Sequence, residues 1–552
     1  MVTHEAKRAD ALQAGRSALA ALRRAARDVA VAPRTREIGR VLSAGDGIAR
    51  VVGLPSARSQ ELIAFPGGVM GIAFNLDADE VGVVLLGEDT AVGAGDTVRC
   101  TGEVVRTPVG RALLGRVVDP LGRPLDGGPD LAAAPGAAEG GALEQRPVEA
   151  EAPGIVARDP VVRPLATGIK SVDAMIPIGR GQRELIIGDR STGKTTLALD
   201  AILNQKSQDV ICVYVAVGQR ASSVARVVEV LRRREALDYS VVVVADADSP
   251  PGLRFITPYA GCAVSEYFME QGHDTLIVYD DLTKHAQTYR EISLLLRRPP
   301  GREAYPGDIF FIHSRLLERA TQLSKEHGGG SQTALPIVET QAQNIAAYIP
   351  TNLISITDGQ IYLNPDLYHS GFLPAVDIGL SVSRVGGKTQ IPAMKKLAPS
   401  LRLAYTQFAE LELFTKFGTT LDKKTRQALE HGRRVRELLK QSAHDPVPLA
   451  EQVLLLEAVG RRMLDDVAAE RVREFERRFR EAARDRLADL LARIGEGGAL
   501  TDEDAEAFRT VVGEVKRVMG DAGEAPRPAP EAGPNRGEGE NSSPGASDAG
   551  SA

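Results

Sequence analysis

Residues 188–195, with the sequence GDRSTGKT, match the pattern G-x-x-x-x-G-K-[S/T] of a phosphate-binding loop. The glycines let backbone N–H groups wrap a phosphate chain, while Lys194 neutralises charge on the terminal phosphates and Thr195 offers a hydroxyl to Mg²⁺. An apolar strand is expected directly before this loop and a helix directly after it, and a helix N-terminus favours an anion. The sequence therefore predicts a nucleotide site. Its expected contacts are Gly188, Asp189, Arg190, Ser191, Thr192, Gly193, Lys194 and Thr195.

A second expected strand, over residues 276–279, ends in an acidic residue, Asp280. We expect Asp280 to hold Mg²⁺ together with Thr195 and to orient a metal-bound water. Hydrolysis would also need a carboxylate that accepts a proton from the attacking water, at the end of the strand that follows the P-loop helix. That position carries Gln219, whose amide accepts no proton at neutral pH. The site, with Gln219 as a further nucleotide contact, is predicted to bind and to cleave poorly.

The amino-acid composition and pattern of the N-terminal part of the chain change near residue 37. Residues 1–36 are rich in Ala, Leu and Arg at helical spacing, which favours a partner-docking helix over a solvated helix or a targeting segment. Short β-branched runs separated by turn residues predict a small β-barrel over residues 37–126, with strands at 48–52, 81–86, 96–100 and 114–118. A Gly/Ala/Pro-rich stretch predicts a linker over residues 127–151.

The remainder of the chain is predicted to form an α/β domain and then a helical domain. Continuous apolar runs at 185–187, 210–215, 241–244 and 276–279 are typical of parallel strands buried on both faces. Helical segments at 195–204, 222–234 and 261–270 alternate with them, so a P-loop domain with a parallel sheet is expected over 152–398. A helical bundle follows over 399–519. Residues 520–552 have almost no large apolar side chains and are predicted to be disordered.

Composition excludes several classes of protein. The chain has 67 basic and 73 acidic residues, a net charge of −6, only 4% aromatic residues and no Trp, which argues against a nucleic-acid partner. Cys100, Cys212 and Cys262 are far apart and lack C-x-x-C spacing, so neither a disulfide framework nor a zinc site is predicted. No apolar run approaches the ~20 residues of a membrane span. Any role at a membrane is therefore expected to act through partners.

Five longer stretches closely resemble the alpha subunit of F-type ATP synthases. They are PIGRGQRELIIGDR at 177–190, LLLRRPPGREAYPGD at 294–308, AYIPTN at 347–352, ISITDGQ at 354–360 and GLSVSRVG at 379–386. The resemblance runs from about residue 37 to about 441. It implies a RecA-like central domain and an α3β3 hexamer with beta subunits around the central stalk gamma. It also implies delta bound by the N-terminal helix, a membrane rotor contacted indirectly, and a peripheral location on the cytoplasmic face of a bacterial membrane.

The same resemblance implies roles for single residues. Alpha subunits hold ATP or ADP without turning it over, and Arg384 corresponds to the arginine finger that alpha inserts into the neighbouring beta site. Tyr368 and Gln441 match residues of the family's adenine pocket. This chain has Ser191 where the family usually has Gln, Leu373 where it has Arg and Ala443 where a second Gln is common. These departures predict faster nucleotide exchange and are compatible with a divergent or alternate rotary ATPase, whose coupling ion, H⁺ or Na⁺, is chosen by the rotor.

Two other classes of protein compete with this interpretation. A self-sufficient hexameric motor, such as a transcription-termination helicase or a protein-export ATPase, would need a carboxylate at the position of Gln219. A pure scaffold would have no use for Arg384. Steady ATPase activity of the purified chain would favour a motor, whereas nucleotide binding without turnover would favour alpha.

Overall fold

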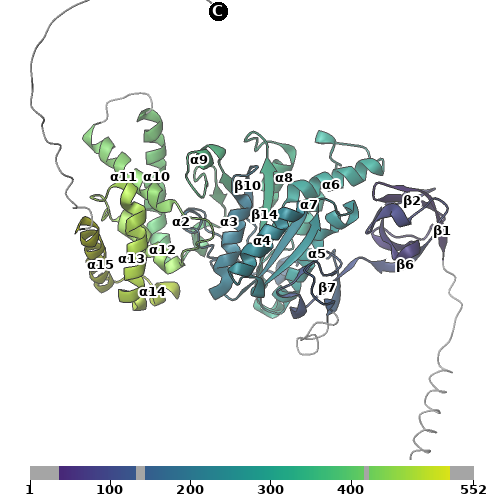
Figure 1. Ribbon diagram of the computed structural model, residues 1–552, viewed down its shortest axis with the longest axis horizontal. Helices are drawn as coiled ribbons and strands as arrows, with labels where there is room; N and C mark the ends of the chain where they lie inside the picture. Colours follow the sequence, from purple (N-terminus) through teal and green to yellow (C-terminus); the bar gives the residue numbers. More distant parts are fainter. Residues whose placement is uncertain (1–36, 132–142, 416–421, 522–552) are drawn as a thin grey trace, which may run out of the picture.

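The computed structural model describes residues 37–131, 143–415 and 422–521, which form three domains in a row (Figure 1). A β-barrel lies at one end, a sheet flanked by helices lies in the middle, and a helical domain lies at the other end. This is the multidomain α/β architecture predicted above. The N-terminal helix expected over 1–36 and nearly all of the tail expected over 520–552 lie outside the described residues.

The barrel contains six antiparallel strands in the closed order β1-β2-β5-β4-β3-β6. They are β1 (Ile38–Gly45), β2 (Ile48–Val52), β3 (Glu61–Ala64), β4 (Met70–Leu76), β5 (Val81–Leu85) and β6 (Thr97–Val104). Alternate side chains such as Val41, Val51, Ile63 and Val83 fill the interior. The strands expected at 48–52, 81–86 and 96–100 are confirmed as β2, β5 and β6.

The strand expected at 114–118 does not belong to the barrel. Because β1 pairs with β6, the barrel has no free edge left to receive another strand. Instead, the two-residue strand β8 (Val117–Val118) pairs with the edge of the central sheet. The expected linker over 127–151 also contains a strand, β9 (Glu144–Pro147), which pairs with β7 (Arg106–Val109). The strands β7, β8 and β9 therefore lie between the barrel and the strands of the central sheet in the sequence, and each of them is paired.

The central sheet has eight strands in the order β16-β15-β10-β14-β13-β11-β12-β8, all parallel except β16. Its further strands are β10 (Leu185–Asp189), β11 (Val210–Gln219), β12 (Ser240–Asp246), β13 (Asp274–Asp280), β14 (Ser331–Thr340), β15 (Gly359–Leu363) and β16 (Val382–Ser383). Its helices are α2 (Lys170–Met175), α3 (Lys194–Leu203), α4 (Ala221–Arg233), α5 (Pro251–Glu270), α6 (Leu282–Leu295), α7 (Ile309–Leu317), α8 (Tyr348–Ile356) and α9 (Pro365–His369). The four apolar runs are thus confirmed as buried strands.

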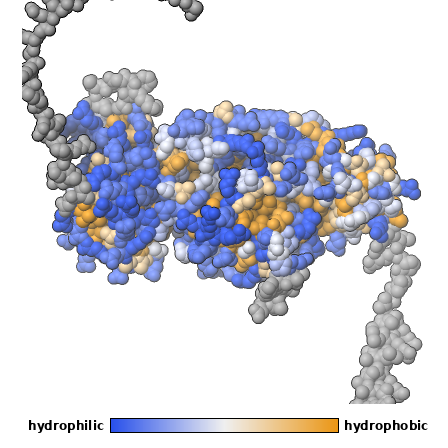
Figure 2. All heavy atoms as spheres, viewed as in Figure 1, coloured by the Kyte–Doolittle hydropathy of each residue, from blue (hydrophilic) through white to orange (hydrophobic). Residues whose placement is uncertain are grey.

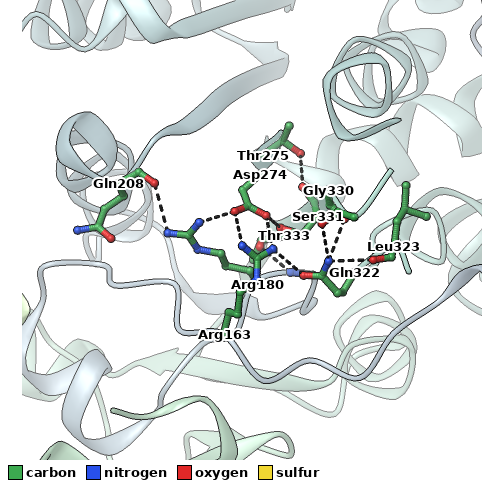
Figure 3. Close-up of polar contacts among 12 residues, drawn as sticks. Arg163, Arg180, Gln208, Asp274, Thr275, Gln322, Leu323, Gly330, Ser331 and Thr333 are labelled. Carbon is green, nitrogen blue, oxygen red and sulfur yellow. Dashed lines mark hydrogen bonds and ion pairs between the residues drawn. The ribbon is translucent and has the colours of Figure 1, made fainter. Parts of the chain in front are cut away.

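The amino-terminal edge of this sheet is held by a cluster of arginines (Figure 3). Asp274, the first residue of β13, accepts two hydrogen bonds from Arg163, at 2.7 and 2.5 Å, and another from Arg180. Arg180 also donates to the carbonyl of Gln208, and the hydroxyl of Ser331 at the start of β14 donates to Asp274. The cluster fastens the segment that precedes β10 to the starts of the neighbouring strands.

The helical domain contains α10 (Pro392–Thr415), α11 (Lys423–Leu439), α12 (Leu449–Gly460), α13 (Val472–Arg486), α14 (Ala488–Gly495) and α15 (Asp502–Asp521). The boundary expected at 398/399 falls inside α10, which begins at Pro392, where proline suits the first turn of a helix, and which also contains Pro399. The surface of this domain is mostly hydrophilic (Figure 2). None of the helices in the described residues is long and apolar enough to cross a membrane.

Candidate functional site

Four parallel strands end together at the carboxyl-terminal edge of the sheet. Their last residues are Asp189 of β10, Gln219 of β11, Asp280 of β13 and Thr340 of β14. The register places Asp189 beside Thr340, and Asp280 beside the end of β11. In parallel sheets, ligands bind in the crevice outside this edge.

The phosphate-binding loop connects β10 to α3. A Cβ atom at Gly188 would lie 2.7 Å from the carbonyl oxygen of Leu363, so only glycine fits there. Gly193 adopts φ +96°, a left-handed conformation that favours glycine. The Thr192 hydroxyl donates to the carbonyl of Asp189 at 2.8 Å and closes the turn. The loop therefore ends with its backbone N–H groups at the start of α3, as phosphate binding requires.

Lys194 lies inside this loop, with its ammonium group buried. Its Nζ donates to the carbonyls of Gly188 at 2.9 Å and Asp189 at 2.6 Å. Burial lowers the pKa of Lys194, and the nearby carboxylates, Glu339 foremost, oppose that shift. The loop thus holds a desolvated positive charge where a phosphate would bind.

Asp280 is the centre of the polar contacts beside the loop. Its carboxylate accepts hydrogen bonds of 2.7 Å from the hydroxyls of Thr195 and Tyr214 and from the amide of Gln219. The carbonyl oxygen of that amide accepts from Lys284 Nζ at 2.8 Å. Three residues predicted from the sequence are thereby brought together. Tyr214 and Lys284 were not predicted, although Tyr214 is the one hydroxyl in the apolar run 210–217.

A cavity of about 360 Å³ extends from the loop along α3. It is lined by Ile169, Ser191, Thr192, Gly193, Lys194, Thr195, Thr196, Leu197, Asp200, Leu363, Tyr368, Leu373, Pro374, Ala375, Gln441, Ser442 and Ala443. Its size is within the range of small-molecule sites. One end is polar and contains the P-loop, and the other end is mostly apolar. This combination suits a ligand with a phosphate chain and a flat ring system.

Not every predicted contact lines this cavity. Gly188 and Asp189 form the base of the loop, Arg190 is exposed beside it, and Gln219 lies behind it on Asp280. Tyr368, on α9, lines the apolar end with 38% of its surface exposed.

Gln441 also lines this end, but its amide is bonded to the protein. Its Nε2 donates to the carbonyls of Gly168 at 2.7 Å and Asp445 at 2.8 Å, and its Oε1 accepts from the backbone N–H of Lys170 at 3.1 Å. Both amide hydrogens are therefore in use. A ring bound here would contact Gln441 by packing.

Asp200 and His444 are polar residues of this site that the sequence did not predict. Asp200 lies on α3, and its Oδ1 accepts from the backbone N–H of His444 at 2.8 Å and faces the His444 Nδ1 at 3.2 Å. Burial raises the pKa of Asp200 to about 6, and the contacts with His444 oppose that shift. No local pattern joins two residues so far apart in the sequence.

Arg384 lies at the opposite edge of the sheet. It follows β16, and its backbone N–H donates to Asp358, whose own N–H donates to Arg183. The P-loop begins at Gly188, five residues after Arg183, which corresponds to about 17 Å at strand spacing. The exposed guanidinium donates to the carbonyls of Thr357 at 3.2 Å and Ile354 at 3.4 Å. It therefore lies away from the cavity of its own chain.

Comparison with known families matches all three domains. The beta-barrel domain of the ATP synthase alpha/beta family matches residues 34–102, its nucleotide-binding domain matches residues 168–383, and its C-terminal domain matches residues 390–515.

Relatives named ATP synthase subunit alpha match most of the chain. A protein of Syntrophotalea carbinolica named subunit alpha 2 is 56% identical over 489 residues, covering 89% of this chain and 92% of the relative. A subunit alpha 2 of Albidiferax ferrireducens is 54% identical over 517 residues, covering 94% of each. A subunit alpha of Dehalococcoides mccartyi is 54% identical over 487 residues, covering 87% of this chain and 94% of the relative. With the P-loop site and the three-domain architecture, these matches place the chain in the family of F-type ATP synthase alpha subunits.

Proposed function

We propose that this chain is the regulatory, non-catalytic nucleotide-binding subunit of a rotary ATP synthase, and that it lends Arg384 to a neighbouring catalytic site. The observation that carries the proposal is the position of Arg384. It is exposed and lies about 17 Å along the sheet from the P-loop of its own chain. Within the described residues its guanidinium is in no ion pair. A planar cation so placed is available to charge developing on a phosphoryl group of another subunit.

The absence of turnover is supported by the contacts of Gln219. An amide at this position cannot take the proton of an attacking water, and this one is held between Asp280 at 2.7 Å and Lys284 at 2.8 Å. A rotation of the side chain would break both bonds. The chain's own site is therefore expected to bind ATP or ADP without hydrolysing it.

Mg²⁺ would be held by Thr195 and Asp280. The Thr195 hydroxyl and the Asp280 carboxylate lie 2.7 Å apart beside the P-loop, and Mg²⁺ prefers such oxygen ligands. When bound, the ion supplies positive charge to the terminal phosphates. Lys194 and the backbone N–H groups at the start of α3 orient the phosphate chain.

Membership of the family also supports a set of partners. Beta subunits would alternate with this chain in an α3β3 hexamer around gamma, delta would bind the segment 1–36, and the assembly would couple ATP synthesis or hydrolysis to proton or sodium transport on the cytoplasmic face of a membrane. Ile155, Val156 and Phe311 are 92%, 85% and 60% exposed, and the segments that carry them are joined by the Arg158–Glu318 contact. Large exposed apolar side chains are typical of subunit interfaces.

Replacement of Arg384 in the assembly of alpha, beta and gamma subunits tests the proposal. Arg384→Ala should lower multisite turnover by about 10³–10⁵-fold, the range known for such arginines, and leave nucleotide binding by the isolated chain unchanged. Lys388→Ala removes a nearby exposed cation and serves as the control. Normal multisite turnover with Arg384→Ala would contradict the proposed role. Steady hydrolysis by the purified chain alone would contradict the non-catalytic assignment.

A further inference from the structure

The apolar end of the nucleotide cavity is closed by a short loop, residues 441–444, between α11 and α12. Ser442 and Ala443 line the cavity, and the residues on either side of them are bonded to the rest of the protein. On one side, the N–H of Gln441 donates to the carbonyl of Leu373 at 2.8 Å. On the other side, His444 is bonded to Asp200. The wall of the cavity is therefore a loop fastened at both ends.

The bond at His444 is the one that reaches the P-loop helix. Asp200 lies on α3, the helix whose first residues are Lys194 and Thr195, and its own side chain lines the cavity. The Asp200 carboxylate contacts both the backbone N–H and the imidazole of His444. It therefore joins the phosphate end of the site to the loop that forms the wall at the other end. The loop cannot move away from α3 without breaking both contacts.

The backbone of His444 is a second, independent observation. Its φ is +60°, a left-handed conformation that costs non-glycine residues about 1 kcal/mol or more. Such a conformation persists when neighbouring contacts impose it. The imidazole is only 29% exposed and the carboxylate 10%, so the contacts to Asp200 are shielded from water. The loop is thus held in a strained conformation by its bond to α3.

We propose that the Asp200–His444 pair sets how long a nucleotide stays in the cavity, by fastening the 441–444 loop to the P-loop helix. This inference rests on the proposed function, because it requires that the cavity holds a nucleotide. It also gives the site a means of retention besides the adenine contacts that Leu373 and Ala443 no longer supply. His444 acts here as a positioning residue, since it holds the wall and need not touch the ligand.

The test compares two replacements of His444 and one of Asp200 in the full-length chain, loaded with a fluorescent ATP analogue and Mg²⁺ and chased with excess ATP. His444→Gly permits the left-handed backbone and removes the side chain, whereas His444→Asn permits that backbone and keeps a side-chain N–H donor. We expect release to be several-fold faster in His444→Gly and close to wild type in His444→Asn. Asp200→Ala, which removes both bonds, should release about tenfold faster, equivalent to about 1.4 kcal/mol.

Two further measurements separate this role from a general loss of structure. The association rate and the thermal midpoint without nucleotide should stay unchanged in the His444 variants. Lys440→Ala, on the same segment but bonded to Glu437, should release nucleotide like the wild type. If His444→Gly releases as slowly as the wild type, the inference is wrong while the proposed function stands. If the wild-type chain retains no nucleotide, both are wrong.

Discussion

A buried ion pair between Lys170 and Glu476 joins the nucleotide-binding domain to the helical domain. The two side chains meet at 2.5 Å, with Lys170 fully buried and Glu476 11% exposed. Burial lowers the pKa of Lys170, and the charge and hydrogen bond of Glu476 oppose that shift. We therefore predict that Glu476→Gln, which keeps the shape and removes the charge, destabilises the docking of α13 severely.

The loss of stability expected for Glu476→Gln has an upper limit, because Lys170 can lose its proton. Removing one partner of a buried pair costs about 3–5 kcal/mol. At pH 7 the unpaired Lys170 can instead lose its proton. Deprotonation costs about 1.36 kcal/mol for each pH unit below the ordinary lysine pKa near 10.4, which gives about 4.6 kcal/mol at pH 7 as the largest possible loss. We expect a loss of about 3–4 kcal/mol at pH 7. The loss should stay near this value up to about pH 8, where deprotonation of Lys170 becomes the less costly alternative, and shrink by about 1.4 kcal/mol per pH unit above that.

Urea unfolding followed by circular dichroism at 222 nm measures this loss, since the chain has no Trp to serve as a fluorescent probe. The comparison is made on the transition of the helical domain, because three domains need not unfold in one step. Lys170→Met combined with Glu476→Gln should recover most of the stability, because no charge is then stranded. Glu235→Gln, in the exposed pair with Lys206, is the control and should leave the transition unchanged. A Glu476→Gln loss below about 1 kcal/mol, or one independent of pH, would refute the reasoning.

Three further predictions concern other contacts. Although burial opposes its ionisation, hydrogen bonds, foremost from Arg163, hold the pKa of Asp274 below its ordinary value. Its contribution to stability is therefore present above pH ~4 and lost as the pH falls further. The urea midpoints of Asp274→Asn and wild type should differ at pH 7, and this difference should shrink as the pH falls below ~4. Thr195→Val should weaken ATP binding with Mg²⁺ and leave binding in EDTA unchanged, as titration calorimetry would measure; equal effects in both would contradict the assignment of a metal ligand. Ala443→Gln should slow nucleotide release, because it adds a hydrogen-bond donor at the apolar end of the cavity. Unchanged release in a chase experiment would mean that the side chain at this position does not contact the ring of the nucleotide.

The parts of the site that the sequence predicted are those whose chemistry is local. The P-loop is complete within eight residues, and Asp280 follows from the rule that side chains at the ends of parallel strands meet. The contact between Asp200 and His444 joins residues 244 positions apart, and no periodicity encodes it. Gln441 lines the cavity, but its bonds to backbone carbonyls depend on the packing of Gly168 beside it.

The fold was predictable to a similar extent and for similar reasons. Strands such as β11 are long, apolar and β-branched, so that their type and burial could be read directly. The run at 114–118 has the same local character, but the partner of a strand depends on which edge is free. The barrel is closed, and the run pairs with the edge of β12 instead. The boundary expected at 398/399 falls inside α10, which already begins at Pro392, a residue type that suits the first turn of a helix.

The strand β8 is only two residues long, yet it occupies the outermost position of the central sheet. Without it, β12 would present a row of unpaired backbone groups, and such a row pairs readily with the same row of another molecule. Because β8 comes from the segment after the barrel, a chain shortened to begin at residue 152 would lose this cover along with the barrel. We expect such a fragment to aggregate through β12, even though every residue of its nucleotide site is present.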